Sequence, residues 1–417
     1  MTRSEAADAA GDSAPVAYRE VFAVGEFRAL WAAQLASVAG DQLARVALAV
    51  LVFDRTGSAG WSALTYALTF LPDLIGGPLL SGFADRYSRR LVMVVCDLAR
   101  VGLVAVMAIP GLPLWLLCVV LFVVQLFASP FSAARAAQLA TILTGDRYVL
   151  GSSVSNVTSQ AAQLLGFVAG GTIVAGLGVS QALLIDAGTF GLSALFVWVG
   201  TREHALTAGP ARPPWLAAIA AGSVLVWRDR RLRYLVALAC ISGFYITVEG
   251  LAIPYAAEVG GGAMAAGVLL AANPAGQVVG MLVLTRQPPA TRLRLMSWLA
   301  IGSCLPLVAC ALRPGLWMTV GLWALSGFSS AYQLVANAAF VQSVPDAQRG
   351  QAFGLARTAL IVSQGVGVLV AGIAADLWTP ATVVAAAGML GIVAAACAAR
   401  GYVRACRAVP GPGVAMT

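Results

Sequence analysis

The chain has 417 residues, of which 60% are hydrophobic and only 11% are charged, and its mean hydropathy is +0.85. A soluble protein of this length cannot bury so much apolar surface, which excludes an ordinary water-soluble enzyme or binding domain. The net charge of +8 comes from arginine without any lysine. A basic surface beside anionic lipids accounts for this charge without a nucleic-acid partner.

Apolar runs long enough to cross a bilayer recur along the chain after residue 26. A helix needs roughly 20 apolar residues to cross a hydrocarbon core of about 30 Å. The runs are continuous rather than alternating, which favours helices over barrel strands. We predict an all-α membrane protein with twelve transmembrane spans near residues 27–53, 61–84, 91–110, 113–134, 150–176, 180–200, 233–258, 262–285, 293–312, 315–341, 351–375 and 379–402.

The two ends of the chain and the loops set the expected orientation. The polar segment 1–26 lacks the pattern of a signal peptide, so the first span is expected to remain uncleaved. Most arginines lie in the tails or in alternate loops, whereas Arg55 and Arg313 lie on the opposite side. Because arginine-rich short loops stay in the cytoplasm, both tails, residues 1–26 and 403–417, are predicted to be cytoplasmic.

The first two spans contain ionisable residues. Gln34, Ser37, Asp41 and Arg45 recur at steps of three and four residues and form one polar helix face. An unpaired charge at the bilayer centre costs about 3 kcal/mol or more, so Asp41 either pairs with Arg45 one turn away or binds a proton. Asp73 in the second span is a second proton-binding candidate, unless it only bonds a neighbouring helix.

The loop between the second and third spans reads Gly82-Phe-Ala-Asp-Arg-Tyr-Ser-Arg-Arg90. Gly82 permits close approach of helices, and Asp85 can face the positive N-terminal end of a neighbouring helix. Arg86, Arg89 and Arg90 can meet phosphates or carboxylates. An ordinary positive-inside loop would explain the arginines but not Gly82 and Asp85.

Charged or polar residues also occur in the third, fourth and sixth spans. Asp97 and Arg100 are three residues apart and are interpreted as a structural ion pair rather than a functional one. Gln125 begins a short polar stripe on the fourth span. Asp186 lies in the first turns of the sixth span, where the helix dipole is expected to stabilise its charge.

The second half of the chain repeats features of the first. Residues 166–171 in the fifth span align with residues 367–372 in the eleventh, at an offset of 201 residues, and a proline-rich segment separates the halves. Two halves that rock about a central site are what an alternating-access transporter requires. We expect six-helix halves at residues 27–200 and 233–402, joined by a cytoplasmic linker at 201–232.

Two spans of the second half have polar stripes. Tyr245 and Glu249 lie on the seventh span, and Gln333 and Asn337 lie on the tenth. Glu249 has no basic residue within one helical turn, so it is a candidate proton or substrate site. A polar residue in such a helix can instead bond a neighbouring helix, which is the competing interpretation for each stripe residue.

The loop at residues 82–90 closely resembles the loop motif of the major facilitator superfamily, and the resemblance extends over the chain after residue 26. The pattern made by Gly40-Asp41, Arg45, Asp54-Arg-Thr-Gly-Ser58 and Asp97 with Arg100 is similar to the bacterial branch that includes enterobactin and macrolide exporters. The fifth span resembles that family's exporter motif at Gly166, Gly170 and Gly171. Phe167 replaces the usual proline there, which weakens the case for proton antiport.

The resemblance implies an arrangement of the site. In the superfamily, spans one, four, seven and ten line the central cavity, and the loop at residues 82–90 forms a cytoplasmic gate. The candidates for contact with the transported molecule are then Gln34, Arg45, Gln125, Tyr245, Gln333 and Asn337.

These observations predict a secondary active transporter in a bacterial inner membrane, working as a monomer without a cofactor. The leading hypothesis is an exporter of a small organic molecule, driven by protons that bind Asp41, Asp73 or Glu249. The sequence contains no phosphate-binding loop or nucleophile triad, so it does not predict an enzyme. Import of a nutrient, lipid flipping and a non-transporting receptor remain alternatives.

Overall fold

The computed structural model describes residues 18–70, 72, 76, 87–203, 223–344 and 348–407, which are helical nearly throughout and contain no strand. The predicted all-α class is therefore confirmed. The helices before residue 204 are α2 (Tyr18–Ala23), α3 (Gly25–Thr56), α4 (Ala59–Ala67), α6 (Arg89–Met107), α7 (Leu114–Ile142), α8 (Asp146–Leu177) and α9 (Val179–Gly200).

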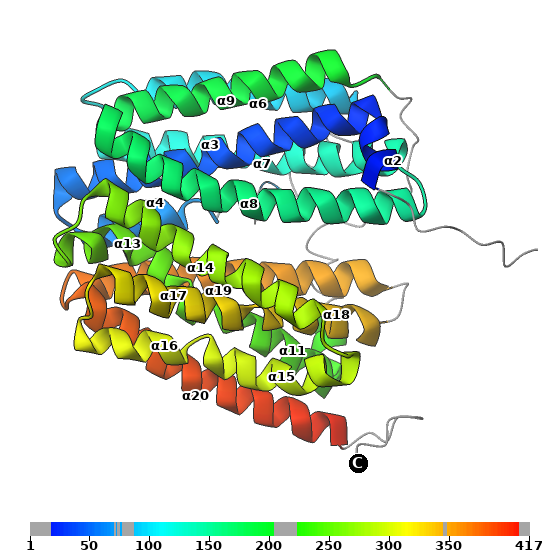
Figure 1. The fold of residues 1–417 in the computed structure, drawn as a ribbon, viewed down its shortest axis with the longest axis vertical. Coiled ribbons are helices and arrows are strands. Elements are labelled where there is room, and N and C mark those ends of the chain that lie inside the picture. Colours follow the sequence, from blue (N-terminus) through cyan, green and yellow to red (C-terminus); the bar gives the residue numbers. More distant parts are fainter. Residues whose placement is uncertain are drawn as a thin grey trace, which may run out of the picture.

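The helices after residue 223 are more often interrupted. They are α11 (Arg230–Cys240), α12 (Ser242–Tyr245), α13 (Thr247–Glu258), α14 (Ala263–Thr285), α15 (Pro289–Gly302), α16 (Leu305–Val308), the 3₁₀ helix η1 (Ala309–Leu312), α17 (Leu316–Ser330), α18 (Tyr332–Ser343), α19 (Arg349–Ala375) and α20 (Pro380–Arg407). Figure 1 shows α2 to α9 in one half of the bundle and α11 to α20 in the other.

Successive helices run back and forth between two ends of the bundle. The start of α2 and the end of α20 lie near one end, which we call the terminal end, and the turn between α3 and α4 lies at the other, which we call the distal end (Figure 1). Gly57 adopts a left-handed conformation (φ 63°), and its N–H bonds the carbonyl of Phe53 at 2.8 Å. Ser58 then caps α4 by accepting from the N–H of Trp61. This short turn makes α3 and α4 antiparallel neighbours.

Nine helical segments within the described residues are long and apolar enough to cross a membrane. They are Gly25–Thr56, Leu114–Ile142, Asp146–Leu177, Val179–Gly200, Arg230–Glu258, Ala263–Thr285, Pro289–Leu312, Ala352–Ala375 and Pro380–Arg407. Of the other three predicted spans, the second continues into residues outside the description, the third holds several charges, and the tenth breaks at Ala331. The number of twelve spans stays a prediction.

The seventh predicted span breaks twice, after α11 and after α12. At the first break the N–H of Ile241 bonds the carbonyl of Leu238, and at the second the N–H of Glu249 bonds that of Ile246, at 3.2 and 3.0 Å. These are three-residue steps that tighten the helix. Glu249 therefore lies in the first turn of α13, directly beside an irregular stretch of backbone, a feature common at the binding sites of transporters.

The internal repeat is also visible in the packing, because glycines at equivalent positions of α8 and α19 make close helix contacts. A side chain at Gly166 would approach the carbonyl oxygen of Ala39 in α3 to 2.7 Å, and one at Gly171 would approach that of Ala263 in α14 to 2.6 Å. In α19, side chains at the equivalent positions 367 and 372 would collide with α12 and α4. Helices α8 and α19 thus each pack closely on one helix of their own half and on one helix of the other half.

Candidate functional site

Arg100 in α6 is the centre of a buried charged cluster. Its guanidinium lies 3.9 Å from the carboxylate of Asp41 in α3 and 3.8 Å from that of Asp97 in its own helix. It also donates to the carbonyl of Val124 at 3.3 Å and lies over the ring of Phe190. Asp97 does approach Arg100, as its spacing predicted, but the arginine is shared with Asp41. The structure thus pairs Asp41 with Arg100 rather than with Arg45.

Asp186 joins the same region from α9. Its side chain is 1% exposed, and it lies seven residues beyond the first residue of α9. At that depth the dipole of the helix end is too far away to stabilise its charge. The hydroxyl of Thr189 donates to its carboxylate at 3.3 Å. Gly40 leaves room for this carboxylate, since a side chain there would collide with Asp186 and Thr189.

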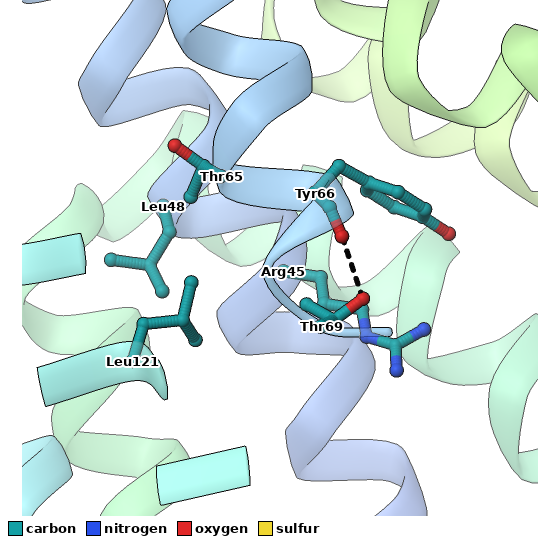
Figure 2. Close-up of a pocket in the computed structure, with 6 residues that line it drawn as sticks. All are labelled: Arg45, Leu48, Thr65, Tyr66, Thr69 and Leu121. Atoms are coloured by element: carbon teal, nitrogen blue, oxygen red, sulfur yellow. Dashed lines mark hydrogen bonds between the residues drawn. The ribbon is translucent and has the colours of Figure 1, made fainter. Parts of the chain in front are cut away.

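Two small cavities adjoin the cluster, and Arg45 lines both. One is lined by Asp41, Asp186 and Gln125 together with apolar residues of α6 and α7. The other is bounded by α3, α4 and α7, and Figure 2 shows Arg45, Tyr66 and Thr69 beside one another there. Arg45 lies 5.8 Å from the centroid of the Tyr66 ring and donates to the amide oxygen of Gln42 at 3.3 Å.

Tyr66 connects this region to the other half of the bundle. Its hydroxyl donates a hydrogen bond to the carboxylate of Glu249 in α13, and both side chains are buried. Arg45 of α3 lies over the ring of the same tyrosine. Glu249 therefore finds its hydrogen-bond partner across the interface rather than within its own helix. Sequence reasoning did not single out Tyr66, because a tyrosine in an apolar helix has no spacing that reveals a distant partner.

Several of the residues predicted to contact cargo form hydrogen bonds to neighbouring helices in this structure. Gln34 donates to the hydroxyl of Ser159 in α8 and accepts from Arg135 in α7 at 2.6 Å. Gln333 in α18 donates to the hydroxyl of Tyr245 at 3.3 Å and to a carbonyl of α11. Asn337 is exposed on α18.

The predicted gate loop is described only at its end. Arg89 donates to the carbonyl of Ala137 in α7 at 3.0 Å, and Arg90 lies 4.3 Å from the centroid of the Trp198 ring in α9. Both arginines thus bind helices of their own half. The other predicted residues of the loop, together with one proton-binding candidate, lie outside the described residues: Gly82, Asp85, Arg86 and Asp73.

At the distal end, a carboxylate holds the two halves together. Asp376, which follows α19, accepts from the hydroxyl of Ser58 at 2.9 and 3.0 Å and from the N–H of Gly60 at 3.1 Å. Deeper in the bundle, the amide of Gln160 in α8 donates to that of Gln277 in α14 at 3.2 Å.

Comparison with known proteins agrees with this architecture. The family model described as Major Facilitator Superfamily matches residues 30–289. The chain is 29% identical over 245 residues to the multidrug efflux pump Tap of Mycobacterium tuberculosis, covering 53% of this chain and 56% of the relative. It is 27% identical over 175 residues to the MFS-type transporter YfiS of Bacillus subtilis, covering 42% of each chain.

A third relative, the macrolide efflux protein A of Streptococcus pyogenes, is 29% identical over 102 residues, covering 24% of this chain and 25% of the relative. The matches to these relatives thus span about a quarter to just over half of their lengths.

Solved structures show the same fold over nearly the whole chain. A nucleoside transporter superposes with a TM-score of 0.73 at 13% identity, covering 91% of this chain and 99% of that one. A bacterial homologue of the human lysosomal transporter Spinster gives 0.73 at 14% identity, covering 95% and 98%. At such identities the likeness concerns the fold alone. The family match and the fold together show a transporter rather than an enzyme, and the chain belongs to the Major Facilitator Superfamily.

Proposed function

We propose that the chain is a proton-coupled exporter of small organic molecules that works by alternating access. The observation that carries the proposal is the hydrogen bond from Tyr66 to Glu249 across the two halves. A carboxylate changes both its charge and its hydrogen-bonding capacity when it binds a proton. Protonation of Glu249 would therefore alter a contact that the two halves must break when they rock.

The relatives favour export and suggest the chemistry of the cargo. Two of them are named as efflux proteins, one for macrolides and one for multiple drugs. Amphipathic organic molecules of this kind suit an interface that combines apolar helices with a few charged groups, here Arg45, Glu249 and Asp41. The proton gradient supplies about 2.3 kcal/mol per charge for each 100 mV of membrane potential.

The proposal includes an orientation in a bacterial inner membrane. The terminal end, where the arginine-rich segments lie, faces the cytoplasm, and the distal end faces outward. The contacts of Asp376 with Ser58 and Gly60 then close the outer side of the transporter. The gate at residues 82–90 would act on the opposite side.

Reconstituted proteoliposomes test the proposal. A pH gradient should drive accumulation of a macrolide or a lipophilic dye, and Glu249→Gln should abolish this flux but keep exchange of cargo across the membrane without a gradient. Glu258→Gln is the matched control, because Glu258 lies on the same helix but caps α20 and pairs with Arg313 within its own half. Flux that ignores both the gradient and Glu249→Gln would contradict proton coupling, and the direction of accumulation separates export from import.

A further inference from the structure

Arg135 in α7 is a positive charge without a partner of opposite charge. Its guanidinium donates to the amide oxygen of Gln34 in α3 at 2.6 Å, and the side chain is half-buried. Among the residues that the structure describes, no carboxylate lies at ion-pair distance from it. The neutral amide of Gln34 accepts a hydrogen bond but does not compensate the charge. An unpaired charge inside a membrane protein commonly marks the path of a ligand.

The carboxylates of α3 on either side of Gln34 are bonded elsewhere. Glu26, about two turns before it, accepts from a backbone N–H just after α9 at 3.4 Å. Asp41, about two turns after it, lies 3.9 Å from the guanidinium of Arg100. Neither carboxylate is therefore available to compensate Arg135.

Gln34 is held in an orientation that aims the guanidinium. The hydroxyl of Ser159 in α8 donates to the carbonyl of Ser155 at 2.9 Å, so it accepts in its contact with Gln34. The amide nitrogen of Gln34 then faces Ser159, and the amide oxygen faces Arg135. The other N–H groups of Arg135 have no partner among the described residues and, unlike the Nε of Arg45, they are not buried.

The guanidinium lies between the terminal end and the carboxylates around Arg100. Arg135 is seven residues before the last residue of α7, about 10 Å along the helix axis. Arg100 bonds the carbonyl of Val124, which is eleven residues, or about 16 Å, deeper on the same helix. A long arginine side chain near a helix end can extend to the aqueous surface, but this one turns to α3. Cargo that enters from the terminal end therefore meets Arg135 first.

We propose that Arg135 binds the acidic group of an amphipathic organic anion, with Gln34 as the residue that positions the guanidinium. This inference rests on the proposed export function and adds an acidic group to the expected cargo. A carboxylate can accept two parallel N–H bonds from a guanidinium, which compensates the charge and fixes the orientation. Asp41 and Asp97 share one arginine, so their region repels an anion. The acidic end of the cargo thus stays at Arg135, and its apolar body points towards the distal end.

Binding of three pyrene compounds tests this inference. Pyrenebutyrate, pyrenebutanol and pyrenebutylamine share an apolar body and differ in charge. Binding to the full chain in phosphatidylcholine nanodiscs is followed by energy transfer from tryptophan to pyrene, with empty nanodiscs as the background. Arg135→Gln should weaken binding of the acid about tenfold, because a charge-assisted bond is lost, and should leave binding of the alcohol unchanged. Arg135→Lys keeps the charge and should restore part of the affinity.

Gln34→Glu tests the same site with the arginine in place. The carboxylate that it introduces lies beside Arg135 and compensates its charge, so binding of the acid should fall as much as in Arg135→Gln. Arg147→Gln is the control, because Arg147 pairs with Glu20 on the surface of the same half, and it should leave all three affinities unchanged.

Unchanged binding of the acid in Arg135→Gln, or equal losses for the acid and the alcohol, would overturn the inference. Loss of acid binding in nanodiscs that also contain phosphatidylglycerol would assign Arg135 to lipid phosphates and overturn its role in cargo binding. The measurement requires neither a gradient nor flux. If binding behaves as expected while proteoliposomes show no gradient-driven flux, the proposed function fails and the anion site stands.

Discussion

The carboxylate of Asp376, at the end of α19, accepts hydrogen bonds from the hydroxyl of Ser58 at the start of α4, 318 residues away in sequence. The N–H of Gly60 adds a third bond. Opening of the distal end requires these bonds to break, so we expect Asp376→Ala to favour the distally open state. A bond to an exposed charged group is worth about 1 kcal/mol, which corresponds to a roughly fivefold shift in population.

Spin labels at Ile109 and Leu312 report this shift, because both positions are exposed at the distal end and lie in opposite halves. The distribution of distances between them should broaden towards longer values in Asp376→Ala. Thr379→Ala serves as the control, since Thr379 accepts from Arg313 within the second half. An identical distribution in Asp376→Ala would show that other contacts hold the distal end closed.

Gly171 is expected to be essential for the packing of α8 on α14. Gly171→Ala would place a methyl group 2.6 Å from the carbonyl oxygen of Ala263 and 2.9 Å from the Cα of Gly267, so the backbones must separate. Such overpacking costs about 1–3 kcal/mol. Gly176→Ala in the same helix has nothing within 4 Å and should stabilise the protein by up to about 1 kcal/mol. The unfolding temperature measured in detergent should be lower than that of wild type for Gly171→Ala and higher for Gly176→Ala.

Arg100 should be the most sensitive position of the charged cluster. Arg100→Gln leaves the buried Asp97 and the partly buried Asp41 without their cation, a change that costs about 3–5 kcal/mol. Adding Asp97→Asn removes one of the two unpaired charges and should recover part of that loss. Unfolding of the two single variants and the double variant gives the coupling energy, and additive effects would show that the pair does not interact.

The hydroxyl of Tyr66 is expected to matter for function more than for folding. Tyr66→Phe keeps the ring that lies beside Arg45 but removes the hydrogen bond to Glu249. We expect gradient-driven flux in proteoliposomes to fall about tenfold, since a lost bond to a charged group costs about 1.5–3 kcal/mol. Tyr255→Phe, which removes a bond to Thr319 within the second half, is the control. Equal losses in both variants would indicate a general packing effect.

The amino-acid sequence predicted the helices and the internal repeat, because a membrane span depends on a run of apolar residues and on the turn that ends it. Residues 166–171 and 367–372 were aligned from the sequence alone. In the structure, the glycines of both segments let their helices, α8 and α19, pack closely on two neighbouring helices. The breaks at Ile241 and Ala331 were not predicted, although Ser242-Gly243 follows the first and Ser329-Ser330 precedes the second. Local hydrophobicity reports that a segment spans, but not whether its backbone is regular.

The amino-acid sequence by itself determined the membrane class, the family motifs and the identity of the intramembrane carboxylates, since each follows from composition or from spacing within one helix. Only the tertiary structure decided the partners of those carboxylates. Asp41 is bonded to Arg100 rather than to Arg45, and Glu249 is bonded to Tyr66 from the other half. The physical reason is that an ion pair or hydrogen bond depends on distance in space. Folding brings together helices that are distant in sequence, and no pattern within a single helix shows which helices become neighbours.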